Sequence, residues 1–151
     1  MILDPSYYCS ISICLLYIKL QYILYIPDDN LAYKDPVAQE RAIQAVGPFV
    51  NEYFPPETLG QILEHYLSSL DQSELHRRGF SLALGNLPKT VLKGHLDKVL
   101  SVLIEKTKIT KTTEVWAEAR RDVIKAIINI IKTMGVSQGH NGNEMGFNII
   151  I

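Results

Sequence analysis

The chain has 151 residues and carries 15 Lys and Arg against 16 Asp and Glu, which gives a net charge of −1 at pH 7. That balance excludes a strongly basic nucleic-acid-binding domain, because no surplus of cations offsets the phosphate charge. Hydrophobic residues make up 47% and charged residues 21%, as in globular proteins. Two cysteines are too few for a disulfide framework, and no Asn-x-Ser/Thr acceptor occurs. We therefore expect a cytosolic protein.

The N-terminal segment, residues 1–34, differs in composition from the rest of the chain. Residues 1–26 contain only two charged residues, Asp4 and Lys19. Residues 7–26 have about the length that spans a membrane, but Lys19 lies inside this stretch and disfavours insertion. No positive region precedes the apolar run, so a signal peptide fits poorly. Three interpretations stay open: a segment foreign to the protein, such as translated non-coding sequence, which the composition favours; a buried segment; and a membrane anchor.

Residues 35–136 show apolar residues at helical spacing and no convincing strand, so we predict an all-α fold. Asp35 and Pro36 are typical of a helix start, and Gly135 is typical of a helix end. Residues 107–113 are polar and predict a connector. Residues 137–151 are rich in Gly and Asn and predict a disordered tail. The expected helices cover residues 36–54, 57–70, 74–87, 90–106 and 114–135.

Two of these helices share a pattern that repeats after 43 residues. Arg77 and Arg78 match Arg120 and Arg121, and Ala83 matches Ala126. The offset lies in the range of roughly 40–47 residues that is typical of HEAT and armadillo helix pairs. In such a solenoid each pair closes its apolar face against the next, and small residues such as Ala83 let neighbouring helices approach closely. We predict a HEAT/armadillo-like helical-hairpin solenoid fragment of about five helices; a five-helix bundle with a chance match is the alternative.

The last expected helix, residues 114–135, is apolar nearly all round. A helix of this kind is normally covered on both sides. No further helix is expected after it, so we predict that one apolar face lies open and favours self-association. The residues concerned are Val123, Ile124, Ile127, Ile128, Ile130 and Ile131.

No motif for nucleotide binding, metalloprotease, esterase or redox chemistry occurs in the sequence. We therefore expect no catalytic residue, no metal and no cofactor. Glu114, Glu118 and Asp122 are spaced by four residues, which is typical of one solvated helix face. The histidines, His65, His76, His95 and His140, are scattered and lack metal-ligand spacing.

The paired arginines are the most distinctive polar feature. In one interpretation an arginine of each pair binds a carboxylate such as Asp122 or backbone carbonyls, which is a structural role. In the other, the four arginines form a ridge that binds an acidic partner, since the planar guanidinium fork suits carboxylates. The candidates for partner binding are Arg77, Arg78, Arg120 and Arg121. We expect Phe80 and Trp116 to belong to the core.

Three stretches together resemble the tubulin-folding cofactor D family (tubulin-specific chaperone D). Residues 75–88 read Leu-His-Arg-Arg-Gly-Phe-Ser-Leu-Ala-Leu-Gly-Asn-Leu-Pro, residues 92–94 read Leu-Lys-Gly, and residues 117–122 read Ala-Glu-Ala-Arg-Arg-Asp. The resemblance is strongest over residues 72–136 and extends back to residue 35. Residues 1–34 and the last few residues do not share it. Family members are several times longer, so the resemblance implies an internal fragment with ends foreign to the family.

The resemblance implies a non-enzymatic function in the cytoplasm, associated with the cytoskeleton. It implies binding of β-tubulin and assembly of the α/β-tubulin heterodimer together with the other tubulin-folding cofactors. It also implies stimulation of tubulin GTP hydrolysis in the assembled complex and association with an Arf-like small GTPase. Two alternatives remain: a HEAT-repeat scaffold of another family, and a small membrane-anchored helical protein that uses residues 7–26.

Overall fold

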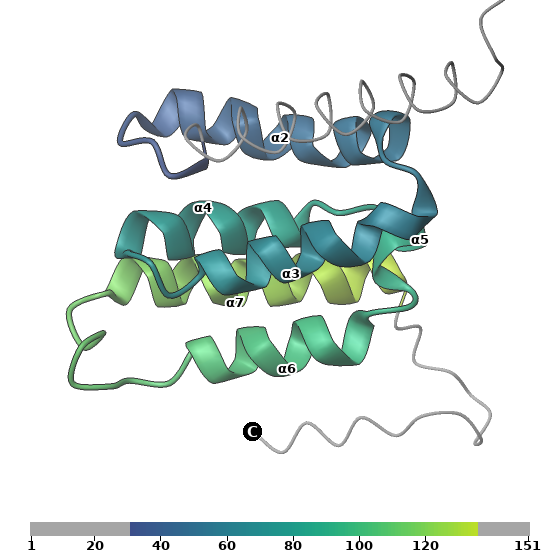
Figure 1. Ribbon diagram of the computed structural model, residues 1–151. Helices are drawn as coiled ribbons and strands as arrows, with labels where there is room; N and C mark the ends of the chain where they lie inside the picture. Colours follow the sequence, from purple (N-terminus) through teal and green to yellow (C-terminus); the bar gives the residue numbers. More distant parts are fainter. Residues whose placement is uncertain (1–30, 136–151) are drawn as a thin grey trace, which may run out of the picture.

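The computed structural model describes residues 31–135, apart from the side chain of Tyr53, and these residues form helices and no strand. The all-α prediction is confirmed. The candidate membrane segment, Cys9, Cys14, His140 and the predicted tail lie outside the described residues. The elements are α2 (Pro36–Tyr53), the 3-10 turn η1 (Pro56–Thr58), α3 (Leu59–Ser69), α4 (Glu74–Gly85), α5 (Lys89–Leu92), α6 (Leu96–Lys106) and α7 (Ala117–Met134) (Figure 1).

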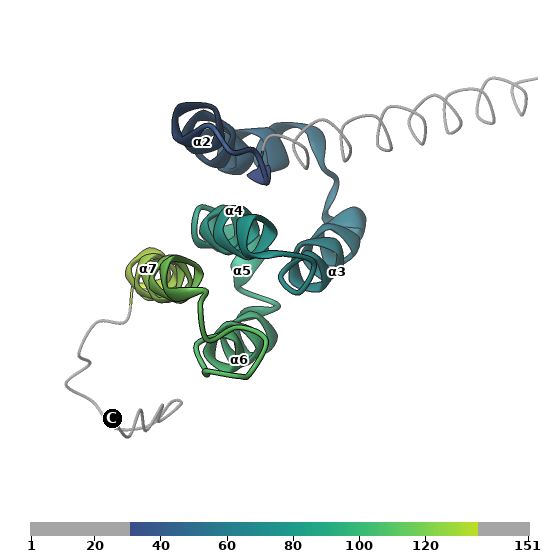
Figure 2. The ribbon, with the colours of Figure 1, turned by 90° about the vertical axis from the view of Figure 1, so that its left-hand side faces the viewer.

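The helices form two layers. Seen end-on, α2, α4 and α7 make one layer, and α3 and α6 make the other (Figure 2). Helix α4 contacts α2 and α7 within its own layer and α3 across the layers, and α6 contacts both α7 and α3. The chain runs in one direction through α2, α4 and α7 and in the opposite direction through α3 and α6 (Figure 1). The 43-residue repeat therefore relates two neighbouring, parallel helices, α4 and α7.

Helices α4 and α7 approach each other closely because small residues lie between them. Ala83 and Ala126 are both fully buried, as the sequence predicted. A Cβ atom added at Gly85 would lie 2.8 Å from the Cα of Ala126. Apolar side chains from every helix then fill the space between the layers; those fully buried include Leu70, Phe80, Leu84, Leu92, Val99, Leu103, Val123 and Ile130.

The helix ends follow the signals in the sequence. The Asp35 carboxylate accepts a hydrogen bond from the backbone N–H of Val37 at 3.0 Å, and the Ser73 hydroxyl accepts one from the backbone N–H of His76 at 3.2 Å. Both contacts satisfy N–H groups that lack a partner within the helix. Gly135 ends α7 with a φ of 64°, in the left-handed region that glycine adopts without strain.

Two predicted helix boundaries are wrong. The helix expected over residues 90–106 is broken at Lys93-Gly94-His95, where the His95 N–H donates to the Leu92 carbonyl at 2.9 Å in a tight turn. The helix expected from residue 114 begins at Ala117. There the connector forms its own turns, with the Trp116 N–H donating to the Thr113 carbonyl at 3.0 Å.

The folded core also includes Leu31, which falls inside the N-terminal segment that the sequence separated from the rest. Leu31 is fully buried, and its carbonyl accepts a hydrogen bond from Gln39 Nε2 at 2.8 Å. Gly79 on α4 makes room for it, since a Cβ atom there would lie only 1.8 Å from the Leu31 carbonyl oxygen. The packed body thus begins at least four residues before the predicted boundary at Asp35.

Candidate functional site

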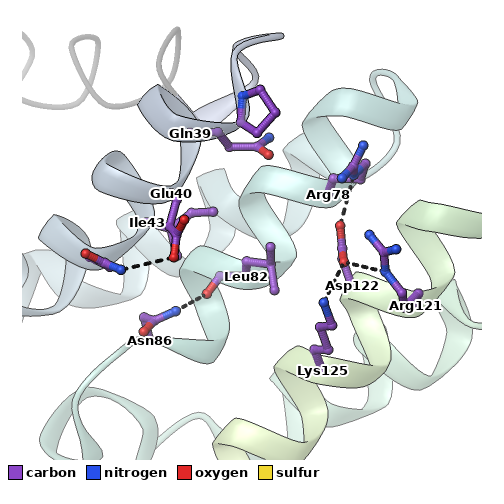
Figure 3. Close-up of a pocket in the computed structure, with 11 residues that line it drawn as sticks. Gln39, Glu40, Ile43, Arg78, Leu82, Asn86, Arg121, Asp122 and Lys125 are labelled. Carbon is purple, nitrogen blue, oxygen red and sulfur yellow. Dashed lines mark hydrogen bonds and ion pairs between the residues drawn. The ribbon is translucent and has the colours of Figure 1, made fainter.

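A groove of about 440 Å³ lies between α2, α4 and α7 and combines apolar and charged side chains (Figure 3). Helix α4 supplies its middle, α2 forms one wall and α7 the other. Ile43 and Leu82 are its central apolar residues. The full lining consists of Pro36, Gln39, Glu40, Ile43, Gln44, Arg78, Leu82, Asn86, Arg121, Asp122 and Lys125.

Asp122 is the central charged residue of the groove. Its side chain is only 2% exposed, yet it receives cations from two helices. Arg78 Nε on α4 lies 2.9 Å from one carboxylate oxygen. Arg121 Nε lies 3.2 Å from the other oxygen, with Lys125 Nζ at 3.7 Å (Figure 3). One buried carboxylate therefore holds α4 against α7 and orients three cations.

The predicted solvated helix face of Glu114, Glu118 and Asp122 is wrong for Asp122, which is buried, and wrong in part for Glu114, which is exposed but lies outside the helix. Asp122 is buried because it points toward α4, where Arg78 compensates the loss of water. Glu114 precedes the first residue of α7 and belongs to the connector. Of the three, only Glu118 lies exposed on the helix, where it pairs with Arg78 Nη1 at 2.5 Å.

Arg77 lies on another side of α4 and is buried, with 4% of its surface exposed. Its Nε donates to the Leu70 carbonyl at 2.9 Å, and its Nη2 donates to an Asp71 carboxylate oxygen at 2.8 Å. Its guanidinium carbon also lies 4.8 Å from the centroid of the Trp116 ring, a cation–π contact. Arg77 thus joins the α3–α4 turn to the start of α7 and takes no part in an exposed ridge.

Arg120 resembles Arg77 in bonding backbone carbonyls. It is half-buried, and its guanidinium donates to the carbonyls of Thr113 and Glu114 in the connector. The single ridge of four arginines is therefore not formed, because consecutive residues of an α-helix point about 100° apart. The structure brings Arg78 and Arg121 together at the groove and places Arg77 and Arg120 away from it. The predicted bonds to Asp122 and to carbonyls are confirmed.

The prediction that Phe80 and Trp116 belong to the core is confirmed for Phe80 and not for Trp116. Phe80 is 1% exposed and lies in the core. His65 is half-buried, with its ring 6.0 Å from the Phe80 ring in an edge-on arrangement. Trp116 is half-buried beneath Arg77 and therefore serves the packing of a charged side chain more than the apolar core.

Asp71, outside the groove, has an altered pKa. Burial raises the pKa of its carboxyl, but the hydrogen bonds and charges of Lys106 and Arg77 lower it by more, so the pKa lies below its ordinary value. Lys106 Nζ lies 2.6 Å from one oxygen and Arg77 from the other. Asp71 therefore links the α3–α4 turn to α6.

The groove suits the binding of a carboxylate-bearing segment. Its lining carries three cations, Arg78, Arg121 and Lys125, against the two carboxylates of Glu40 and Asp122. Arg121 and Lys125 are 53% and 57% exposed and stay accessible while they contact Asp122. Within residues 31–135 no group of three or more His, Cys, Asp or Glu residues is arranged to hold a metal ion.

Two features of the molecule gave no signal in the sequence. The contribution of α2 to the groove, through Gln39, Glu40 and Ile43, depends on which helix faces meet, and α2 carries no repeat that would align it with α4. A second hollow, of about 560 Å³, opens where α5 and α6 separate and is lined from Lys93 to Lys98 and by Met134. It follows from the unexpected break near Gly94.

None of the described helices is both long enough and apolar enough to cross a membrane. No protein-family model matches this chain, and no solved structure matches it at a significant level.

Proposed function

We propose that this chain is a non-enzymatic interaction protein that binds an acidic protein segment in the groove between α2, α4 and α7. The observation that carries the proposal is the placement of Arg121 and Lys125, which contact the buried Asp122 and remain more than half exposed. Side chains held in this way lose less freedom when a partner binds. The guanidinium fork can form two parallel hydrogen bonds to a partner carboxylate.

The partner that we propose is β-tubulin, with the function implied by the resemblance to the tubulin-folding cofactor D family. The chain would help assemble the α/β-tubulin heterodimer in the cytoplasm, with the other tubulin-folding cofactors and an Arf-like small GTPase, and stimulate tubulin GTP hydrolysis in that complex. Residues 75–88 and 117–122 carry the resemblance, and they include Arg78, Arg121 and Asp122 of the groove. Tubulin surfaces are acidic, which matches the cations of the groove.

A HEAT-like solenoid is part of the same proposal. Its support is the parallel, side-by-side placement of α4 and α7, each paired with an antiparallel helix of the second layer (Figure 2). This is the arrangement that a repeat of 43 residues would produce. A stack of such pairs offers a long surface that holds a partner through many small contacts, without catalytic residues.

The experiment compares tubulin binding by the full chain and by Arg121→Glu, using purified α/β-tubulin in sedimentation and light-scattering assays. We expect binding that weakens with salt and falls about tenfold or more in the variant, because an acidic side chain would repel the acidic partner. Lys111→Glu, a matched charge reversal in the connector, should bind as the unchanged chain does. Equal binding by Arg121→Glu would exclude the groove.

Failure to bind tubulin at all would instead exclude the tubulin partner and favour the alternative, a helical scaffold of another HEAT family that uses the same groove. The membrane-anchored alternative depends on residues 7–26, which lie outside the described residues. It is tested separately, by asking whether the full chain pellets with lipid vesicles.

A further inference from the structure

We propose that α7 carries a second binding surface, which takes an amphipathic helix whose apolar face is bordered by acidic residues. The surface is centred on an isoleucine stripe, formed by Ile124, Ile128 and Ile131. Ile124 is 49% and Ile128 44% exposed, and Ile131 is half-buried. The isoleucines do not line the groove, although Arg121 and Lys125 lie between the two surfaces and border both. The proposal does not depend on tubulin binding.

The packing of α7 against the core does not need the isoleucine stripe. The buried face of this helix is complete without it, since Ala119, Val123, Ala126 and Ile130 are all fully buried. The stripe has the spacing i, i+4, i+7 by which a helix presents an apolar face to another helix. Helix α7 lies at the end of its layer, and no described helix lies beyond it (Figure 2).

Cations border the stripe. Arg121 precedes Ile124 by three residues, and Lys125 precedes Ile128 by three, spacings that place side chains beside each other on a helix. Lys132 is exposed one turn after Ile128. Asp122 contacts Arg121 and Lys125, but it also contacts Arg78 of α4, and Glu118 pairs with that same arginine. These two carboxylates therefore face Arg78 and three cations of α7, which leaves a net positive charge on this side of the helix. The exposed side of α7 is therefore apolar along its centre and basic along its border.

This charge pattern selects the occupant. A second copy of α7 laid against the stripe would bring the same cations together, which opposes the self-association predicted from the apolar residues alone. An anionic membrane would accept the cations, but the exposed residues lack the Trp, Phe and Leu typical of membrane-surface helices. An acidic amphipathic helix matches both the apolar centre and the basic border. Its apolar residues would cover Ile124 and Ile128, and its carboxylates would reach Lys125 and Lys132.

The test uses a synthetic amphipathic peptide of about 18 residues, five turns of helix, with leucines along one face and glutamates beside them. Its binding to the full chain is measured by fluorescence anisotropy. We expect the affinity to fall about tenfold or more in the double variant Ile124→Ser/Ile128→Ser and, independently, in Lys132→Glu. A peptide with lysines in place of the glutamates should not bind.

The connector supplies matched controls, because Ile109 is 71% exposed and Lys111 is also exposed. Ile109→Ser and Lys111→Glu should leave peptide binding unchanged, and all variants should melt as the unchanged chain does. The proposal would be overturned if the control variants lost as much affinity for the peptide as the stripe variants do. It would also be overturned if the lysine peptide bound as tightly as the glutamate peptide. It would also be overturned if the chain ignored the peptide but pelleted with phosphatidylserine vesicles, or if sedimentation revealed a dimer that Ile128→Ser abolishes.

Discussion

Arg78 Nε on α4 and an Asp122 carboxylate oxygen on α7 lie 2.9 Å apart, although 44 residues separate them in the sequence. The contact joins two parallel helices at a point where the carboxylate is almost completely buried. The other two cations that contact Asp122, Arg121 and Lys125, belong to α7 itself. The contact with Arg78 is therefore the one that favours a particular alignment of α7 along α4. The same contact positions the cations at the groove.

The first prediction concerns this ion pair. Asp122→Ala should lower the free energy of unfolding by about 3 kcal/mol, because the partly buried Arg78 would lose its buried carboxylate and keep only the exposed Glu118. Glu118→Ala is the control: Glu118 also contacts Arg78 but is 57% exposed, so its loss should cost at most about 1 kcal/mol. Urea unfolding followed by circular dichroism measures both. Similar losses of unfolding free energy in the two variants would show that the burial of Asp122 adds nothing to the stability provided by its ion pair.

The second prediction compares two glycines in helices. Gly85→Ala should destabilise the fold by about 1–3 kcal/mol, since the added Cβ would lie 2.8 Å from the Ala126 Cα and force α4 away from α7. Gly60→Ala in α3 should instead stabilise it by about 0.5–1 kcal/mol, because nothing lies within 4 Å of the added atom. Thermal melting curves of the two variants should shift in opposite directions. A shift of the same sign would contradict the close approach of α4 and α7.

A third prediction separates the arginines by role. Arg77→Ala should destabilise the protein by about 2–4 kcal/mol, because it removes a buried side chain that bonds Leu70 and Asp71 and covers Trp116. Arg121→Ala should change stability by only about 0.5 kcal/mol, since its side chain is 53% exposed. The ratio of the two effects, from chemical denaturation, is the readout. A large effect at Arg121 would assign it a structural role as well.

The fourth prediction is a pH dependence at Asp71. Its pKa in the folded protein lies below the ordinary value of 3.8, because Lys106 and Arg77 outweigh the effect of burial. Its contribution to stability is therefore fully present above that ordinary value and is lost as the pH falls below it through the folded pKa. Asp71→Asn should flatten the stability curve in this acidic range. Measured unfolding free energies that keep the same acid slope in the variant would contradict the prediction.

Much of the fold could be predicted from local signals in the chain. Apolar spacing identified the helices, and Asp35 and Gly135 marked helix ends through backbone chemistry that depends on few neighbours. The repeat identified α4 and α7 as equivalent helices, and it suggested Asp122 as a partner for an arginine. The structure has that contact between Arg78 and Asp122.

What could not be predicted depends on which faces meet. The apolar residues around Gly94 fit one long helix as well as two short ones, and only packing against α7 and α3 distinguishes them. Arg77 and Arg78 look alike in sequence, but one covers Trp116 and the other reaches Asp122, because α4 turns them toward different neighbours. The share of α2 in the groove has the same origin.

The packing of Leu31 against Gly79 has a consequence for N-terminal truncations of this protein. A version that starts at Asp35, where the composition changes, would remove a fully buried side chain and leave the Gln39 amide without its carbonyl. The empty notch above Gly79 would then admit water between α2 and α4, beside the groove. Such a shortened chain would bind a partner weakly because its packing is damaged, and the arginines would not be the cause. Deletions from the N-terminus should therefore end before Leu31.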